Sequence, residues 1–156
     1  MVNKAMVNVI DMPNLRFNGS LWCNLDVALR NVDQIFRRAV RPLNITVIEW
    51  YILRALYEQD GQHASELARA VGRAATSFTP NLDKLESPKT GLIERRPDPS
   101  DRRAVRIYLT EKAQGQRETV QEIAAEIDRQ VASMFSEYDY EKFLNILTVL
   151  QSTLPE

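Results

Sequence analysis

Residues 65–110 place two short amphipathic segments directly before a basic hairpin, and this order constrains the fold more than any other feature of the chain. The first segment begins at Ser65, a good N-cap, and closes at Gly72, which fits the left-handed position that ends a helix. In the second segment we expect helical hydrogen bonding to begin at about Thr76 or Ser77, because the proline of this segment is tolerated only in a first turn. Its apolar residues recur at helical spacing: Phe78, Leu82 and Leu85.

A hairpin is predicted from two short, partly β-branched segments, residues 91–96 and 104–109, on either side of a loop rich in Pro, Asp and Ser. Residues 62–64 could add a very short strand to it. Its basic residues are Arg95, Arg96, Arg102, Arg103 and Arg106. Two helices at a tight turn, followed by a basic two-stranded hairpin, predict a winged helix-turn-helix. Such a thin hairpin can place an arginine in a minor groove, where the potential is most negative.

Long helices are predicted on both sides of this unit. The apolar seam of the first one alternates steps of four and three: Leu21, Leu25, Ala28, Val32, Ile35 and Ala39. It ends before Pro42, because a residue that precedes proline is pushed out of the helical region. The next helix begins at a capping box formed by Thr46 and Glu49, with Ile45 and Trp50 as a hydrophobic staple.

After the hairpin, Thr110 caps another long helix that meets no breaker before residues 136–139, and a last helix runs from about Asp139 to Pro155. The fold class is therefore mainly α with a small β wing, a winged helix-turn-helix with long terminal dimerisation helices. We divide the chain into an N-terminal arm with a dimerisation helix, a winged helix-turn-helix domain and C-terminal dimerisation helices, in this order: residues 1–42, 43–110 and 111–156.

The charge of the chain is unevenly distributed. The formal net charge is −1, but residues 73–106 hold eight Lys/Arg against five Asp/Glu, and residues 107–156 hold four against nine. Local sign decides where a polyanion docks, although a basic cluster can also be a solvated face. No apolar run approaches the roughly 20 residues that span a bilayer, and no secretory signal is visible, so we expect a cytoplasmic protein without a membrane partner.

Catalytic and metal-binding patterns are missing from the sequence. One cysteine and one histidine form neither a disulfide framework nor a cluster of soft metal ligands, and we predict no cofactor. The chain has no Gly-rich phosphate loop and no nucleophile elbow, which argues against an enzyme. A winged module that binds only protein is the other alternative, and the basic hairpin argues against it.

The motif from Leu92 to Lys112, LIERRPDPSDRRAVRIYLTEK, resembles the wing of the MarR (multiple-antibiotic-resistance regulator) family of bacterial transcription factors. The resemblance extends back through LDKLE at residues 82–86 and SELA at residues 65–68. It implies a homodimer that binds double-stranded DNA at a palindromic operator, with one recognition helix of each subunit in a major groove.

This resemblance also assigns roles to residues. The wing pattern Asp-x-Arg falls on Asp101 and Arg103, and it implies that the arginine enters the minor groove while the aspartate orients it. Phosphate-facing candidates are Arg95, Arg96 and Arg102. The recognition-helix candidates are Ser77, Thr79, Pro80, Asn81 and Lys84, whose polar groups suit base edges and phosphates. An ordinary amphipathic helix with a soluble face would show the same helix pattern.

Resemblance to this family further implies repression that a small aromatic or phenolic acid relieves. A crevice for such a ligand could be lined by Trp22, Asp26, Arg30, Trp50 and Arg54, where an arginine would hold the ligand carboxylate. Alternatively, these aromatic residues fill the core.

A peroxide-sensing alternative depends on Cys23, which lies near the predicted start of the first long helix, where a thiol pKa can be lowered. Against it, the region that supplies tyrosines to the reactive cysteine in the organic-hydroperoxide-sensing branch of the family has none at residues 46–50. A buried, inert thiol is the other interpretation of Cys23.

Overall fold

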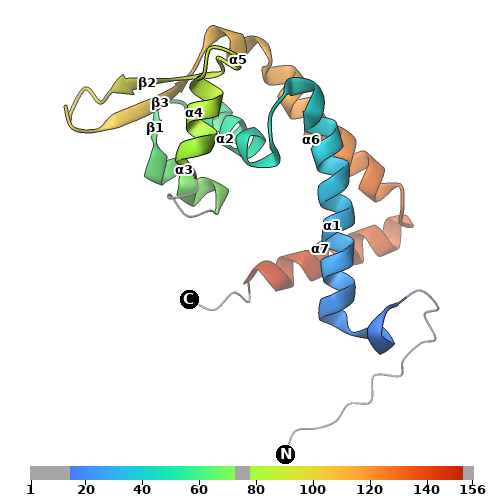
Figure 1. Cartoon of the computed structure of the whole chain (residues 1–156). Coiled ribbons are helices and arrows are strands. Elements are labelled where there is room, and N and C mark those ends of the chain that lie inside the picture. Colours follow the sequence, from blue (N-terminus) through green and yellow to red (C-terminus); the bar gives the residue numbers. More distant parts are fainter. Residues whose placement is uncertain (1–14, 73–77, 153–156) are drawn as a thin grey trace, which may run out of the picture.

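The computed structural model describes residues 15–72 and 78–152 of the 156-residue chain (Figure 1). The elements are η1 (Phe17–Gly19), α1 (Leu21–Val40), η2 (Arg41–Leu43), α2 (Val47–Glu58), β1 (Gln62–His63), α3 (Ala64–Val71), α4 (Thr79–Glu86), β2 (Ile93–Pro97), β3 (Val105–Leu109), α5 (Glu111–Gly115), α6 (Arg117–Ala132) and α7 (Glu137–Ser152). The predicted fold class, mainly helical with a small β wing, is confirmed.

A three-stranded antiparallel sheet forms the base of the wing, in the order β1-β3-β2. The two long strands pair from Ile93 opposite Leu109 to Pro97 opposite Val105. The short strand expected near residue 62 is present, with Gln62 opposite Ile107. This sheet, α2, α3 and α4 form the winged lobe, from which α1 and α6 lead away (Figure 1).

Local caps start the helices of the lobe. In the predicted capping box, the Thr46 hydroxyl accepts from the Glu49 N–H at 3.2 Å and the Glu49 carboxylate accepts from the Thr46 N–H at 2.8 Å. The predicted cap at Ser65 is wrong. The N-cap of α3 is His63, because the Glu66 carboxylate reaches back to the His63 N–H at 2.7 Å and starts the helix two residues earlier.

The recognition helix α4 begins with Phe78 as its N-cap and holds Pro80 in its first turn, where the missing N–H costs nothing. The start predicted at Thr76 or Ser77 lies outside the described residues. The inward face is as predicted, since three side chains are buried: Phe78, Leu82 and Leu85.

The prediction of one continuous helix after Thr110 is wrong, because two helices, α5 and α6, take its place. Thr110 caps a helix as expected, accepting from the Ala113 N–H at 3.3 Å, but that helix ends at Gly115 and α6 starts at Arg117. Glycine is a poor helix former, and Gln116 has a ψ of 1°, which turns the chain between the two helices. The last helix starts at Glu137, two residues earlier than predicted, and its predicted end at Pro155 lies outside the described residues.

Two buried hydrogen bonds join α2 to the C-terminal helices. The Trp50 indole N–H donates to the Val120 carbonyl at 2.9 Å, and the Tyr57 hydroxyl donates to the Ala113 carbonyl at 2.6 Å. Burial raises the pKa of Tyr57 to about 12, against a lowering effect of the Arg117 guanidinium. The winged lobe and the first part of the C-terminal region therefore share one core.

The helices that lead away from the lobe keep apolar side chains in solvent. The first long helix ends at Val40, before Pro42 as predicted, and exposes Leu21, Trp22, Leu29 and Val32. No residue of α7 is buried, and its exposed apolar residues are Tyr138, Leu144, Ile146, Val149 and Leu150. Within the described residues, no helix combines the length and apolar character that crossing a membrane requires.

Replacing Tyr57 with phenylalanine tests the link between α2 and α5. The ring is kept and one buried hydrogen bond is lost, so the free energy of unfolding should fall by about 1 kcal/mol. Urea unfolding measures it. Tyr51→Phe, at a 43% exposed residue of the same helix, is the matched control and should change the free energy of unfolding by less than about 0.5 kcal/mol. Equal effects of the two substitutions would contradict the proposed role of the Tyr57 hydroxyl.

Candidate nucleic-acid interface

The tip of the wing is a tight loop between β2 and β3. The Asp98 N–H donates to the Ala104 carbonyl at 3.0 Å, and the Ala104 N–H donates to the Asp101 carbonyl at 2.9 Å. The Asp101 carboxylate accepts from the backbone N–H of Arg103 at 2.9 Å. In this structure Asp101 therefore shapes the turn that carries Arg103, and it contacts the backbone of Arg103 and not the guanidinium.

Arg102 and Arg103 project from this tip as free cations. Both side chains are exposed, and neither takes part in an ion pair with any of the residues that the structure describes. An unpaired guanidinium on a narrow projection keeps its full charge for a polyanion.

The other three arginines of the hairpin are engaged within the chain. Arg95 joins the wing to α4 through Asp83, at 2.7 Å, and Glu86. Arg96 pairs with Glu94 and lies over the Tyr108 ring, 4.8 Å from its centroid. That Arg95 and Arg96 face phosphates stays a prediction. In such a complex, each guanidinium would contact a phosphate and its carboxylate partner at the same time.

A buried carboxylate, Asp98, organises the base of the wing. It accepts from the Ser100 hydroxyl at 2.6 Å and the Ser100 N–H at 2.7 Å, and from Arg106 Nε at 2.6 Å. These contacts, led by the two from Ser100, hold the pKa of Asp98 well below its usual range. His63 Nε2 lies 3.1 Å from the same carboxylate, and Arg106 also donates to the Gly61 carbonyl at 2.8 Å. Asp98 was not among the residues predicted to have a role.

On α4, the predicted contact residues differ in their surroundings. Thr79 and Pro80 are exposed, and Asn81 is partly buried and lines a groove beside α2. Ser77 lies outside the described residues. Lys84 donates from Nζ to Glu49 Oε2 at 2.8 Å, and the Glu49 side chain is only 2% exposed. Lys84 therefore neutralises a buried charge and ties α4 to the start of α2, which leaves less of its charge for DNA.

The five predicted ligand residues fall into two separate groups. Trp22, Asp26 and Arg30 lie toward the N-terminal end of α1, with Trp22 76% exposed and Arg30 paired with Asp26 at 2.8 Å. Trp50 is buried, and the Arg54 guanidinium lies 5.7 Å from the centroid of its ring. Trp50 and Arg54 lie on α2, which follows the C-terminal end of α1. Within one chain, the two groups are therefore not brought together.

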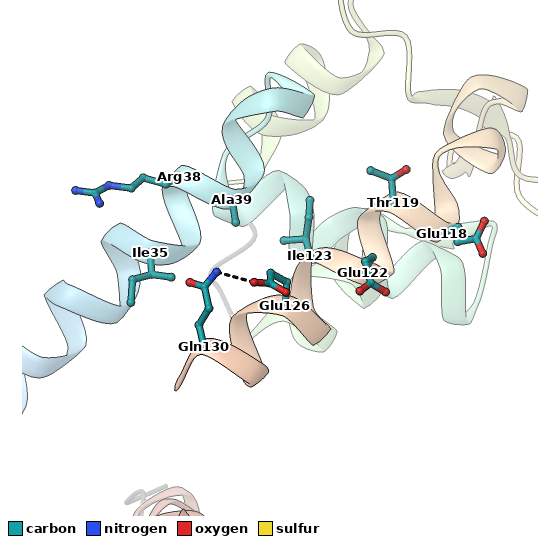
Figure 2. A pocket seen from close by; sticks show the side chains of 9 residues that line it. All are labelled: Ile35, Arg38, Ala39, Glu118, Thr119, Glu122, Ile123, Glu126 and Gln130. Atoms are coloured by element: carbon teal, nitrogen blue, oxygen red, sulfur yellow. Dashed lines mark hydrogen bonds between the residues drawn. The ribbon is translucent and has the colours of Figure 1, made fainter. Parts of the chain in front are cut away.

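An open groove of about 880 Å³ lies instead between α1 and α6. Figure 2 shows Glu118, Glu122 and Glu126 along α6, while Arg38 extends away from them on α1. None of the predicted ligand residues lines this groove.

Cys23 is a partly buried free thiol on the first turn of α1. In the described part of the chain, no three His, Cys, Asp or Glu residues gather closely enough to hold a metal ion.

The three-stranded sheet, the helix pair before it and the arginines at the wing tip define a winged helix-turn-helix protein. Residues 45–105 match the model of the MarR family. Over these residues the chain belongs to the MarR family of transcriptional regulators, as the wing motif predicted.

Solved structures support this assignment. The transcriptional repressor CouR, bound to a 23-mer DNA duplex, is 25% identical, and the match covers 84% of this chain and 92% of that one with a TM-score of 0.74. A probable transcriptional regulator from Pseudomonas aeruginosa is 25% identical, with 81% and 96% covered and a TM-score of 0.69. A MarR regulator from Methanosarcina mazei Go1, 23% identical over 82% and 91% at a TM-score of 0.69, is similar in fold.

Replacing Asp98 with asparagine tests the base of the wing by its pH dependence. The folded pKa of Asp98 lies well below the value of about 3.9 in unfolded peptides. Below about pH 4 the unfolded chain therefore binds a proton that the folded chain does not, and the stability that Asp98 contributes is lost as the pH falls. Urea unfolding at pH 7 and pH 3 should show a smaller loss of stability for Asp98→Asn than for the wild type.

Asp128→Asn, at an exposed position of α6, is the control and should lose as much stability between the two pH values as the wild type. If Asp98→Asn loses as much stability between pH 7 and pH 3 as the wild type does, Asp98 does not hold the wing.

Proposed function

We propose that the chain binds double-stranded DNA with sequence specificity, as a homodimer on a palindromic operator, and represses transcription there. The observation that carries this proposal is the pair of exposed guanidinium groups at the wing tip, Arg102 and Arg103, which have no ion-pair partner in the described part of the chain. Carboxylates engage the other hairpin arginines, so the net positive potential of the hairpin is concentrated at its tip, where a minor groove can accept it.

The recognition face of α4 supports the same proposal. Leu82 and Leu85 fix the helix on the core, which leaves Thr79 and Pro80 exposed on its first turn and Asn81 beside them. Residues near the N-terminus of a recognition helix are the ones that reach base edges. Ser77 and Asn81 are the proposed base contacts, and Lys84 acts mainly by orienting the helix.

Homodimer formation is supported by the exposed apolar side chains of α1 and α7. A monomer that kept these side chains in water would be prone to association, because large apolar side chains that gather on an exposed helix mark interaction sites. A second copy of the chain would bury both helices and set the distance between two recognition helices.

A small ligand that releases the DNA belongs to the same proposal, and the groove between α1 and α6 is a candidate for its site. An aromatic acid, the ligand class implied by the family resemblance, would find the Arg38 guanidinium at one side of this groove and three glutamates at the other. Release by a panel of aromatic acids, with an organic peroxide tested on the wild type and on Cys23→Ser, would separate ligand sensing from thiol sensing.

Arg103→Ala tests the wing. Loss of a minor-groove cation should weaken binding to the DNA upstream of the protein's own gene by about tenfold or more, the equivalent of about 1.4 kcal/mol, and dimer formation should be unchanged. Fluorescence anisotropy and analytical ultracentrifugation measure the two. Arg129→Ala removes the same charge from the exposed face of α6 and should leave the affinity unchanged. Equal affinities of Arg103→Ala and wild type would remove the wing from the interface.

Asn81→Ala tests base recognition. Loss of a side chain that reads a base edge should reduce discrimination at one operator position by about 1–3 kcal/mol, with little effect on nonspecific binding. Binding to a library of single-base operator variants measures the preference profile. A profile identical to that of the wild type would exclude Asn81 from base recognition, and no wild-type binding to any duplex would favour a protein-interaction module.

A further inference from the structure

A second, basic groove lies beside the start of α2 and has no place in the interface described so far. It has a volume of about 440 Å³, and its polar lining comes from three places in the fold: Arg37 and Arg41 at the end of α1 and in η2, Asn44 and Thr46 before α2, and Asn81 and Lys84 on α4. None of the residues that line it is acidic. We call it the α2 groove.

The free charge of the α2 groove resides mainly in Arg41. Lys84 is committed to the buried Glu49 carboxylate, and Arg37 Nε pairs with Asp33 at 2.6 Å. The Arg41 side chain is exposed and forms no ion pair or hydrogen bond with the described residues, and its backbone is fixed because its carbonyl accepts from the Asn44 N–H at 2.9 Å. Asn44 adopts the left-handed conformation, with φ 55° and ψ 33°, that closes this turn.

The start of α2 does not itself supply the donors of this groove. The Thr46 hydroxyl already accepts from the N–H of Glu49, and the Glu49 carboxylate already accepts from the N–H of Thr46. An anion in the α2 groove would therefore bind to guanidinium groups and not to the helix N-terminus.

Helical geometry separates this groove from the acidic one described above. Arg37 and Val40 line the α2 groove, whereas Ile35 and Arg38 line the groove between α1 and α6. Successive residues of a helix are rotated by about 100°, so these pairs lie on different faces of α1. One face of α1 thus meets three glutamates, and another carries Arg37, which lines the α2 groove together with Arg41 of η2.

The position of the α2 groove beside α4 indicates what it binds. Asn81 and Lys84 belong both to α4 and to the wall of the groove. DNA that receives α4 in its major groove carries a phosphate backbone along each edge of that groove, and phosphates are the partners of arginines that flank a recognition helix. We propose that the α2 groove binds a phosphate of the DNA backbone, with Arg41 as its main contact and Arg37 as a second one.

This proposal rests on the proposed DNA binding and adds a third contact region to the recognition helix and the wing. A phosphate contact positions the protein on the duplex without reading sequence. The α2 groove should therefore contribute equally to operator and nonspecific DNA, in contrast to Asn81.

The experiment is the salt dependence of DNA affinity for wild type, Arg41→Gln and Arg129→Gln. Arg129 is the matched control, because it is an exposed arginine of α6 that lines neither groove. Losing one phosphate contact should reduce the slope of log K against log salt by about 0.9. Between 50 and 200 mM salt, the ratio of wild-type to Arg41→Gln affinity should then shrink about threefold, while the preference among operator variants stays as in the wild type.

Arg129→Gln should keep the wild-type slope. If Arg41→Gln also keeps it, while the wild type binds DNA with a clear salt dependence, the α2 groove is not a phosphate site and the proposed function still stands. If the wild type binds no DNA at any salt, both proposals fail together. Circular dichroism melts that match the wild type show that each variant is folded.

A free phosphate ion is the other source of the same chemistry. Thermal unfolding in inorganic phosphate and in chloride of equal ionic strength tests it. Stabilisation by phosphate that Arg41→Gln abolishes, together with an unchanged DNA slope, would overturn the assignment to the DNA backbone. A DNA slope that changes in Arg41→Gln supports it, whether or not free phosphate also binds.

Discussion

Burial of α2 on several sides is the constraint on which the rest of the structure depends. Its first turn holds Lys84 of α4 through Glu49 and donates through the Trp50 indole to α6, and its last turn reaches α5 through Tyr57. Ile52 and Leu53 are fully buried between these contacts. The recognition helix and the C-terminal helices are thus positioned by one common element, and a shift of either relative to α2 would break buried hydrogen bonds that cost about 1–3 kcal/mol each to leave unmade.

The distribution of ion pairs explains how a chain of net charge −1 can present a positive edge. Glu49, Glu86 and Asp98 each take up a basic side chain that would otherwise point into solvent. Removing Lys84 or Arg106 would be costly, because it would leave the buried carboxylate of Glu49 or Asp98 without its cation. Arg102 and Arg103 at the wing tip and Arg41 beside α2 form no ion pair with the described residues, and the backbone of each belongs to a defined turn.

Features set by neighbouring residues were predictable from the sequence. The capping box at Thr46, the wing strands and the inward face of α4 depend on contacts a few positions apart, and the spacing of residue types reports them. Contacts between distant segments were not predictable: Lys84 and Glu49 are 35 residues apart, and Arg106 meets Gly61 across 45. The N-cap preference of single residues also gave a wrong start for α3. Ser65 is a good N-cap in isolation, but the Glu66 carboxylate accepts from the His63 N–H, and the helix therefore starts earlier. Glycine is a weak helix former, but the sequence does not show that the helix ends at Gly115. The change of chain direction there depends on how α6 packs against α1 and α2.

The length of α1 has a mechanical consequence. Its 20 residues make a rod of about 30 Å, and the winged lobe is attached at one end of it. If the other end is held by a second copy of the chain, a tilt of about 5° would move the lobe by about 2.6 Å along an arc of that radius. This displacement approaches the roughly 3.4 Å by which one base pair rises along the axis of the DNA helix. A small angular change at the far end of α1 would therefore be enough to shift the recognition helix out of register with its site.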